Sequence, residues 1–246
     1  MNLDVAATAA LIADRTVLIV GSAPSYTHGV IDPIPELAAL ASEHGVRCHV
    51  DACIGGWVLP FLRDEGGPAW TFAVPGVTSI SVDLHKYGYT PKGISLLLHR
   101  DVALRHGHFF GSAQWPGYTM LNTTLQSTKS GGPLAAGWAV TRHIGLDRYA
   151  DLARRARAAT LAVAAAVDTI DGLSVAAPPD STLLALAADD SCDVFTLSDL
   201  LREKGWLTQP QMSFGDLPAT LHLSFSAATA ESSDALIADL AAAVSV

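Results

Sequence analysis

The stretch VLIVGSAPSYTHGVIDPIPELAALASEHGVRCHVD, residues 17–51, predicts a strand, a helix and a second strand in succession. Residues 17–20 are a short apolar run of branched side chains that ends in Gly-Ser, as a buried parallel strand does. Two prolines then open a helix over residues 36–44, and a glycine ends it before the strand at 46–51. This order is typical of the right-handed crossover unit of an α/β sheet.

Two further strands are predicted at residues 78–82 and 94–98, and they extend the same sheet. In parallel α/β sheets, ligands bind at the carboxyl ends of the strands. Asp51 ends one predicted strand, and the segment 83–86 follows another. We therefore expect these two groups to meet at one edge of the sheet.

The second half of the chain has a different pattern. A helix is predicted at 132–143 and a longer Ala/Arg-rich helix at about 146–166. Shorter elements follow, with strands at 174–176, 183–186 and 221–225 and helices near 195–204 and 233–244. We predict three parts: residues 1–130 as part of a large domain, 131–170 as connecting helices, and 171–246 as a small α+β domain.

The composition limits the possible functions. The 246 residues are 50% hydrophobic and 16% charged, which favours a folded core, and the net charge of −9 argues against a nucleic-acid surface. Three cysteines form no disulfide framework or zinc motif, and we interpret them as buried thiols. No run approaches the ~18 apolar residues of a membrane span, and the first residues lack a basic signal region. These features predict a cytoplasmic protein.

Asp51 and Lys86 are the strongest candidates for chemistry. Asp51 ends an apolar strand, where a solvated carboxylate is not expected, although a turn or helix-capping role stays open. Lys86 lies in the stretch SVDLHKYGYTPKG, residues 81–93, which follows a strand and is rich in turn residues. An ordinary loop lysine is the alternative.

Three segments carry a resemblance to a known family. They are HVDACIGG at 49–56, the stretch at 81–93, and GSAPSYTHGVIDP at 21–33. Together they resemble the sphingosine-1-phosphate lyases, within the group II decarboxylase-like enzymes that use pyridoxal 5'-phosphate (PLP). The resemblance runs over nearly the whole chain. It implies an α/β fold: part of a PLP-dependent transferase large domain (aspartate aminotransferase type, fold type I) plus a small α+β C-terminal domain.

The resemblance also implies roles for residues around the cofactor. A PLP enzyme needs a lysine that forms an imine with the aldehyde, with an amine made available by a depressed pKa, and a carboxylate facing the ring nitrogen. Lys86 is implied as the lysine and Asp51 as the carboxylate. Ala52 would pack its methyl group on the ring, and His85 would lie beside the cofactor phosphate.

Other residues are implied at the edges of the site. Lys92 matches a second active-site lysine, placed for proton transfer or for the substrate phosphate. Tyr26 and His28 lie in a loop that lines the cleft, although a packed tyrosine and a turn histidine are the alternatives. Thr128 and Gly131 match a loop that reaches the cofactor phosphate of a neighbouring subunit. The resemblance thus implies a homodimer with its active site at the interface.

The resulting functional hypothesis is retro-aldol cleavage of a phosphorylated sphingoid base to phosphoethanolamine and a fatty aldehyde. Arg202 is the one arginine after residue 166, and it reads as a solvated helix residue rather than a clamp for a substrate carboxylate. Amino-acid decarboxylation is the alternative activity. A third alternative is an inactive fragment, because the family's phosphate-binding turn and ring-stacking histidine, which precede the position of Met1, are not found.

His106 and His108 have a spacing that would place both rings on one face of a strand. A zinc site needs at least a third ligand, and none is evident nearby. We therefore expect no metal.

Overall fold

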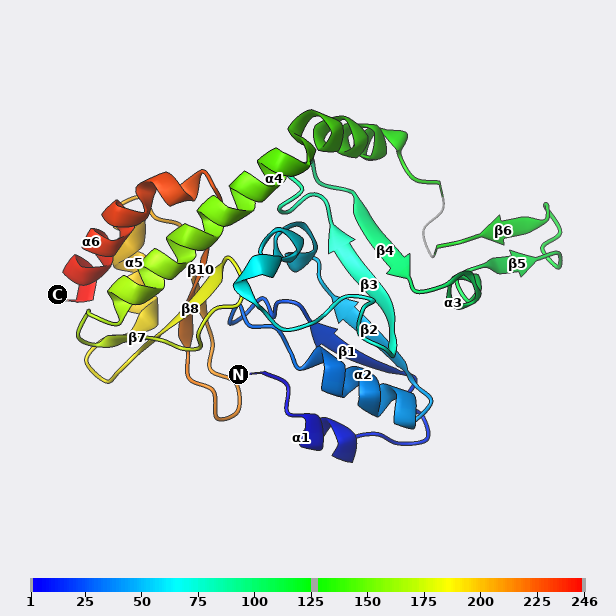
Figure 1. Cartoon of the computed structure of the whole chain (residues 1–246), viewed down its shortest axis with the longest axis horizontal. Helices are drawn as coiled ribbons and strands as arrows, with labels where there is room; N and C mark the ends of the chain where they lie inside the picture. The colour runs from blue at the N-terminus through cyan, green and yellow to red at the C-terminus, as the bar shows by residue number, and fades with distance from the viewer. Residues whose placement is uncertain (1, 125–127, 245–246) are drawn as a thin grey trace.

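A computed structural model describes residues 2–124 and 128–244 and shows a four-stranded β-sheet in each half of the chain, with a long helix that runs across both halves (Figure 1). The first sheet has the order β1-β2-β3-β4. Strands β1 (Leu18–Ser22), β2 (Arg47–Asp51) and β3 (Val77–Asp83) are parallel, as predicted. Strand β4 (Ser95–His99) is antiparallel to β3, whereas the sequence predicted parallel crossovers throughout. The link of residues 84–94 is too short for a helical crossover, so the chain turns back as a hairpin.

One face of this sheet packs against helix α2 (Ile34–Glu43). Alternate side chains of the strands point to this face, and they form the first hydrophobic core with the apolar side of α2. The fully buried members include Cys48, Val50, Leu37 and Ile34. The opposite face carries exposed apolar side chains on the edge strands, namely Leu18, Val20 and Leu97, whereas Leu96 and Leu98 alternate to the α2 side of β4.

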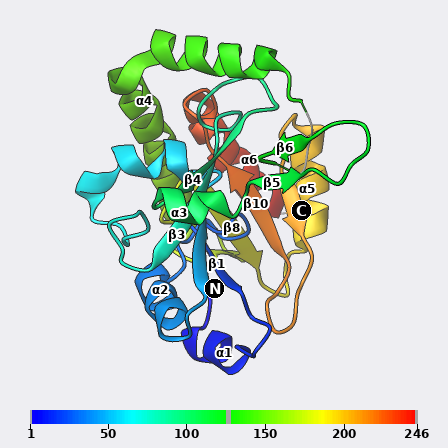
Figure 2. The same cartoon turned by 90° about the vertical axis from the view of Figure 1, so that its right-hand side faces the viewer.

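Short elements complete the first half. Helix α1 (Val5–Ala10) precedes β1, and three 3-10 turns, η1 (Gly55–Trp57), η2 (Leu59–Phe61) and η3 (Arg63–Glu65), follow β2. After β4 come helix α3 (Val102–His106) and a hairpin of β5 (Phe110–Ser112) and β6 (Met120–Asn122). The hairpin projects away from the body of the molecule (Figures 1 and 2). Helix α3 ends at His106, so His106 and His108 do not share the strand that their spacing would allow.

Helix α4 (Gly131–Val167) connects the two halves (Figure 1). The sequence predicted two helices here, and the structure joins them across a break at Gly145, whose φ of 71° is not helical. Glycine accepts this conformation at low cost because it has no Cβ.

The second sheet is antiparallel, with the order β7-β8-β10-β9. Its strands are β7 (Leu173–Val175), β8 (Leu183–Ala188), β9 (Gln209–Gln211) and β10 (Thr220–Ser224). Helix α5 (Val194–Glu203), turn η4 (Thr229–Ser232) and helix α6 (Ser233–Val244) pack with α4 around a second core. Apart from the short β9, which was not predicted, these elements match the sequence expectation.

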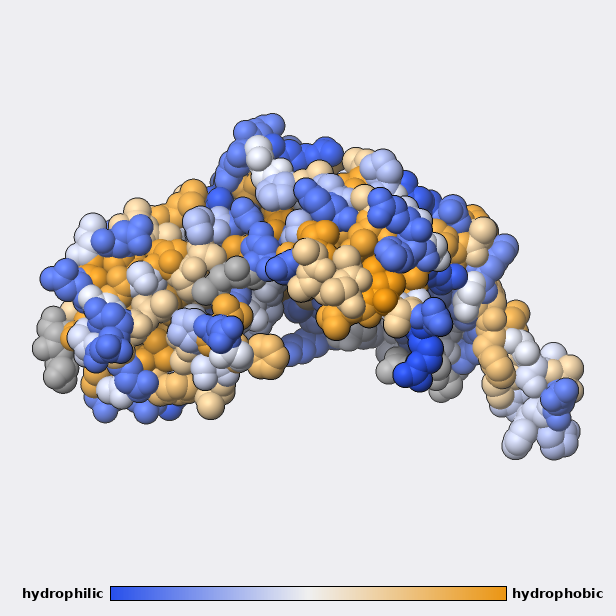
Figure 3. Space-filling model, turned by 90° about the horizontal axis from the view of Figure 1, so that it is seen from below, coloured by the Kyte–Doolittle hydropathy of each residue, from blue (hydrophilic) through white to orange (hydrophobic). Residues whose placement is uncertain are grey.

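Apolar side chains also reach the surface of both halves when the molecule is viewed from below (Figure 3). Among residues 2–124 and 128–244, no helix is both long and apolar enough to cross a membrane.

Candidate active site

The candidate site lies at the carboxyl edge of the first sheet, where β2 and β3 end next to each other. Asp51 is the last residue of β2 and pairs with Ser81 of β3. Lys86 follows three residues after the end of β3, in a turn where its N–H meets the carbonyl oxygen of Asp83 at 3.4 Å. The prediction that Asp51 and the segment 83–86 share one edge is therefore confirmed.

The amine of Lys86 is held by two neighbours. Its Nζ donates a 2.9 Å hydrogen bond to Sγ of Cys53 and lies 3.2 Å from Oδ2 of Asp83. Burial alone would lower the pKa of Lys86, but the contacts with Cys53 and Asp83 outweigh it and raise that pKa above its ordinary value. The expected depression of the Lys86 pKa is thus not what the structure shows, because the adjacent carboxylate favours the charged amine.

Asp51 is fixed by hydrogen bonds to Oδ1. The backbone N–H of Cys53 donates at 3.0 Å and the hydroxyl of Ser81 at 3.2 Å. Burial alone would raise the pKa of Asp51, but these bonds, together with the charge of Lys86, hold that pKa below its usual value. The side chain is therefore an oriented, ionised carboxylate at the strand end.

Ala52 and Cys53 lie in different surroundings. Ala52 has no exposed surface and belongs to the core on the α2 side of the sheet. Cys53, which the sequence presented as a buried thiol, is only half-buried and touches Lys86. The signal that could have found it is strand alternation, since residues two apart point to the same side.

His85 and Lys92 lie close in sequence to Lys86 but differ in surroundings. Nδ1 of His85 donates to the carbonyl oxygen of Ile94 at 2.8 Å, and its Nε2 lies 3.5 Å from Asp83 Oδ2. This bond orients the half-buried ring next to the lysine cluster. Lys92 is exposed, and no ion pair joins it to another described residue.

Tyr26 and His28 follow β1, and Tyr26 contacts the second sheet. The Tyr26 hydroxyl donates to Oε1 of Gln209 at 2.7 Å, and its ring lies 4.3 Å from that of His222. His28 is 5% exposed, and burial lowers its pKa. No hydrogen bond between described residues joins either side chain to Lys86, and Tyr26 is exposed.

Thr128 and Gly131 lie before and at the start of α4. Both are exposed, and within the described ranges no hydrogen bond connects them to Asp51, Cys53 or Lys86. The structure does not bring them to the lysine cluster of the same chain.

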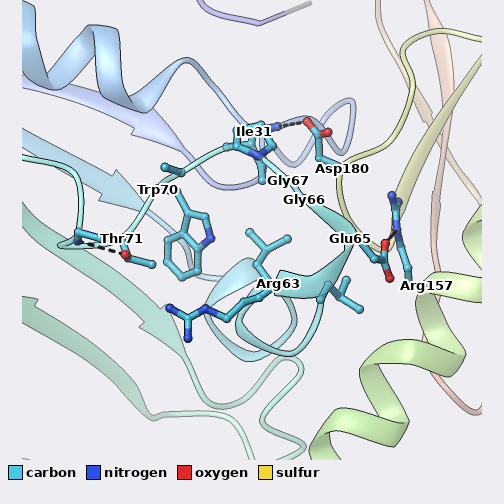
Figure 4. Close-up of a pocket in the computed structure, with 14 residues that line it drawn as sticks. Ile31, Arg63, Glu65, Gly66, Gly67, Trp70, Thr71, Arg157 and Asp180 are labelled. Carbon is cyan, nitrogen blue, oxygen red and sulfur yellow. Dashed lines mark hydrogen bonds and ion pairs between the residues drawn. The ribbon is translucent and has the colours of Figure 1, made fainter.

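Two hollows in the surface lie apart from the lysine. One of about 410 Å³ is lined by the loop after η3, by Arg157 of α4 and by Asp180 (Figure 4). None of the predicted site residues lines it. A groove of about 640 Å³ runs over the exposed sheet face and contains His49, His99 and His108.

No metal site is found among the described residues, because no group of three His, Cys, Asp or Glu side chains has suitable geometry. His108 instead packs edge-to-face on His99, with ring centres 4.8 Å apart.

The donor set fits pyridoxal phosphate. A primary amine and an ionised carboxylate face the same strand edge and are linked through Cys53, which contacts both. An amine is required to bond the aldehyde carbon, and a carboxylate is required to keep the ring nitrogen protonated.

Structural comparison places this arrangement among the PLP-dependent enzymes of fold type I. The sphingosine-1-phosphate lyase of Burkholderia pseudomallei K96243 matches with a TM-score of 0.92 and 35% identity, over 100% of this chain and 56% of that chain. A glutamate decarboxylase from Lactobacillus brevis CGMCC 1306 matches with a TM-score of 0.84, and at 23% identity it shows the fold alone.

The family model described as the pyridoxal-dependent decarboxylase conserved domain matches residues 11–167, and the chain belongs to this family. Similar relatives are sphingosine-1-phosphate lyases. That of Oryza sativa subsp. japonica is 40% identical over 194 residues, covering 78% of this chain and 36% of the relative. The Rattus norvegicus protein, sphingosine-1-phosphate lyase 1, is 35% identical over 225 residues, covering 90% of this chain and 39% of the relative.

These comparisons confirm the predicted fold class and the resemblance to the sphingosine-1-phosphate lyases. They also confirm pyridoxal phosphate as the cofactor of the family to which the chain belongs. The chain spans less than two-fifths of the length of the two curated relatives.

Proposed function

We propose that this chain carries the lysine-bearing part of a PLP-dependent carbon–carbon lyase that cleaves a phosphorylated sphingoid base. The products are phosphoethanolamine and a fatty aldehyde. The observation that carries the proposal is the joint placement of Lys86 and Asp51 at one strand edge. Its support beyond the fold is the identity with several sphingosine-1-phosphate lyases.

When bound, pyridoxal phosphate supplies an aldehyde that bonds amines and a ring that accepts the electrons of the cleaved bond. Lys86 provides the amine that holds it. Asp51 accepts hydrogen bonds on Oδ1, which leaves Oδ2 for the protonated ring nitrogen. Asp83, 3.2 Å from the Lys86 amine, holds that amine in place beside Asp51 and Cys53.

The remaining residues have proposed roles at the edge of the site. His85 lies beside the cofactor phosphate, and Lys92 meets the substrate phosphate or transfers a proton. Cys53, rather than Ala52, supplies the contact to the ring, because Ala52 has no exposed surface whereas Cys53 is half-buried next to Lys86. Tyr26 and His28 shape the cleft from the turn after β1.

Thr128 and Gly131 are proposed to serve the site of a second copy in a homodimer. Their exposure and their separation from the Lys86 cluster support this arrangement. The chain is proposed to divide at residues 130 and 170 into a large domain, connecting helices and a small domain.

A cytoplasmic location is also proposed, and the three free thiols support it.

The test is cofactor binding followed by product analysis. The chain mixed with PLP is expected to give a band near ~420 nm, and borohydride is expected to fix the cofactor on Lys86, as a lysine-bound aldehyde requires. Lys86→Ala should lose the label, and Lys92→Ala should keep it. Absence of the band would leave the inactive-fragment alternative.

A second measurement identifies the bond that is broken. The chain with PLP is incubated with sphingosine phosphate or with aromatic amino acids. Fatty aldehyde from the first supports the lyase, whereas carbon dioxide from the second, without aldehyde, overturns it in favour of a decarboxylase.

A further inference from the structure

A row of hydrogen bonds runs along the sheet behind Asp51. In the register of β2 and β3, His49 pairs with Ser79, and Asp51 pairs with Ser81. Residues two apart on a strand point to the same face, so the four side chains stand together on the face opposite α2. The proposed function does not use His49 or Ser79.

The distances join these side chains into one chain of contacts. Ser81 Oγ lies 3.2 Å from Asp51 Oδ1 and 3.2 Å from Nε2 of His49. The other ring nitrogen of His49, Nδ1, lies 2.8 Å from Ser79 Oγ. Each nitrogen of the imidazole therefore has a hydroxyl partner.

One arrangement of protons satisfies all three contacts. The carboxylate of Asp51 only accepts, so Ser81 donates its proton to Asp51 and accepts one from His49 Nε2–H. A neutral His49 then accepts at Nδ1 from the hydroxyl of Ser79. The hydrogen-bonding partners thus assign the tautomer of His49.

The surroundings of His49 determine when it becomes charged. Burial lowers its pKa, and the charge of Asp51 partly opposes this. Arg47, on the same strand as His49, lines the same groove. His99 of β4 and His108 of the loop after α3 line it as well. From the other side, Val20 of β1 is its apolar strand neighbour. His49 is therefore neutral near pH 7 and gains its proton on acidification.

We propose that Ser81 and His49 are positioning residues that hold Asp51 toward the ring nitrogen of bound PLP, and that the charge on His49 tunes this pairing. This inference rests on the proposed function for the identity of the bound group. A protonated His49 adds positive charge behind Ser81, which stabilises the Asp51 carboxylate and makes it a weaker base toward the ring. The pairing is therefore expected to weaken in acid.

The first test needs no cofactor. The imidazole of His49 is titrated by NMR in the full chain and in Asp51→Asn and Ser81→Ala. Asp51→Asn is expected to move the His49 midpoint to lower pH, because the stabilising negative charge is lost, and Ser81→Ala to change the Nε2 signal. A His49 midpoint and Nε2 signal that are unaffected by both changes would overturn the inference.

The second test uses PLP and its absorbance. Ser81→Ala is expected to weaken PLP binding about tenfold, the size of one hydrogen bond to a charged group. His49→Gln keeps a donor toward Ser81 but does not titrate, so it should bind like the parent while losing the acid-dependent change in the spectrum. His49→Leu should lose both the parent's affinity for PLP and the acid-dependent change in the spectrum. His44→Gln, at an exposed histidine on the end of α2, is the matched control.

The outcomes separate the two proposals. If His49→Leu and His49→Gln bind PLP with the parent's affinity and pH dependence, the positioning role is wrong while the proposed function stands. If the parent chain does not bind PLP, the proposed function fails, and the NMR titration alone decides whether His49 is coupled to Asp51.

Discussion

The amine of Lys86 donates a 2.9 Å hydrogen bond to the thiol sulfur of Cys53, and this contact ties the turn after β3 to the residues after β2. The backbone of Cys53 also donates to Asp51, at 3.0 Å. One small residue thus sets the spacing between the two groups that the cofactor needs. Burial raises the pKa of Cys53, so at neutral pH it serves as a neutral acceptor rather than a nucleophile.

Cys53→Ala is expected to make Lys86 more reactive. Removing the sulfur takes away one of the two contacts that favour the charged amine. A larger fraction of the Lys86 amine is therefore neutral at pH 7.5. The rate at which PLP and borohydride label Lys86, measured by peptide mass spectrometry, should rise about two- to fivefold, as for the loss of one weak hydrogen bond. Cys192→Ala is the control, and a rate equal to that of the parent would contradict the role of the contact.

Asp83→Asn is expected to shift the pH profile of the same labelling reaction toward lower pH. The Lys86–Asp83 pair is partly exposed, with the lysine side chain 35% accessible. Such pairs contribute about 0.5–1 kcal/mol, which corresponds to a shift of about half a pH unit. Asp216→Asn, an exposed carboxylate in the second half, should leave the profile in place. A shift toward higher pH would show that Asp83 does not stabilise the charged amine.

The sequence predicted the edge of the sheet where the site lies, because one rule sufficed: parallel strands end together. Asp51 and Lys86 each follow an apolar run, and that pattern is local. The direction of β4 was not predicted because the strands of this sheet were taken to be parallel. The short link at residues 84–94 already required a hairpin.

Contacts between distant parts of the chain could not be predicted from local patterns. Tyr26 hydrogen-bonds to Gln209 and packs on His222, which belong to the second sheet. Nothing in the turn after β1 identifies these partners, since they come together only when both sheets have formed. The same holds for Arg157 and Glu65, whose ion pair joins α4 to η3.

Arg157→Lys is expected to destabilise the chain by about 2 kcal/mol. The Arg157 side chain is 13% exposed and pairs with Glu65 at 3.0 Å (Figure 4). Its guanidinium also donates to the carbonyl oxygens of Pro179 and Ser181. A lysine keeps the charge but has no planar fork for three acceptors. Arg202→Lys, in an exposed pair with Asp199, should cost about 0.5 kcal/mol or less. Urea unfolding measures both, and equal losses would contradict the prediction.

His222→Phe is expected to make the stability of the chain less sensitive to acid. His222 is buried, and burial lowers its pKa, so the folded chain binds this proton less readily than the unfolded chain. The contribution of neutral His222 to stability is complete above the ordinary histidine pKa of about 6.5 and is lost as the pH falls below that value. Phenylalanine keeps a ring against Tyr26 and removes the titration. The fall in Tm between pH 7 and 5 should become smaller, and an unchanged fall would show that His222 binds its proton equally well in the folded and unfolded chain.

Gly29→Ala is expected to destabilise the chain far more than Gly45→Ala. Both glycines have positive φ, 73° and 65°, so alanine costs about 1 kcal/mol at either through the backbone alone. At Gly45 a Cβ meets nothing within 4 Å, whereas at Gly29 it would lie 2.2 Å from the carbonyl oxygen of Leu183 in β8. The clash should add about 1–3 kcal/mol in urea unfolding, the usual cost of overpacking. Equal losses would mean that the turn after β1 and β8 separate readily, which would also free Tyr26 from the second sheet.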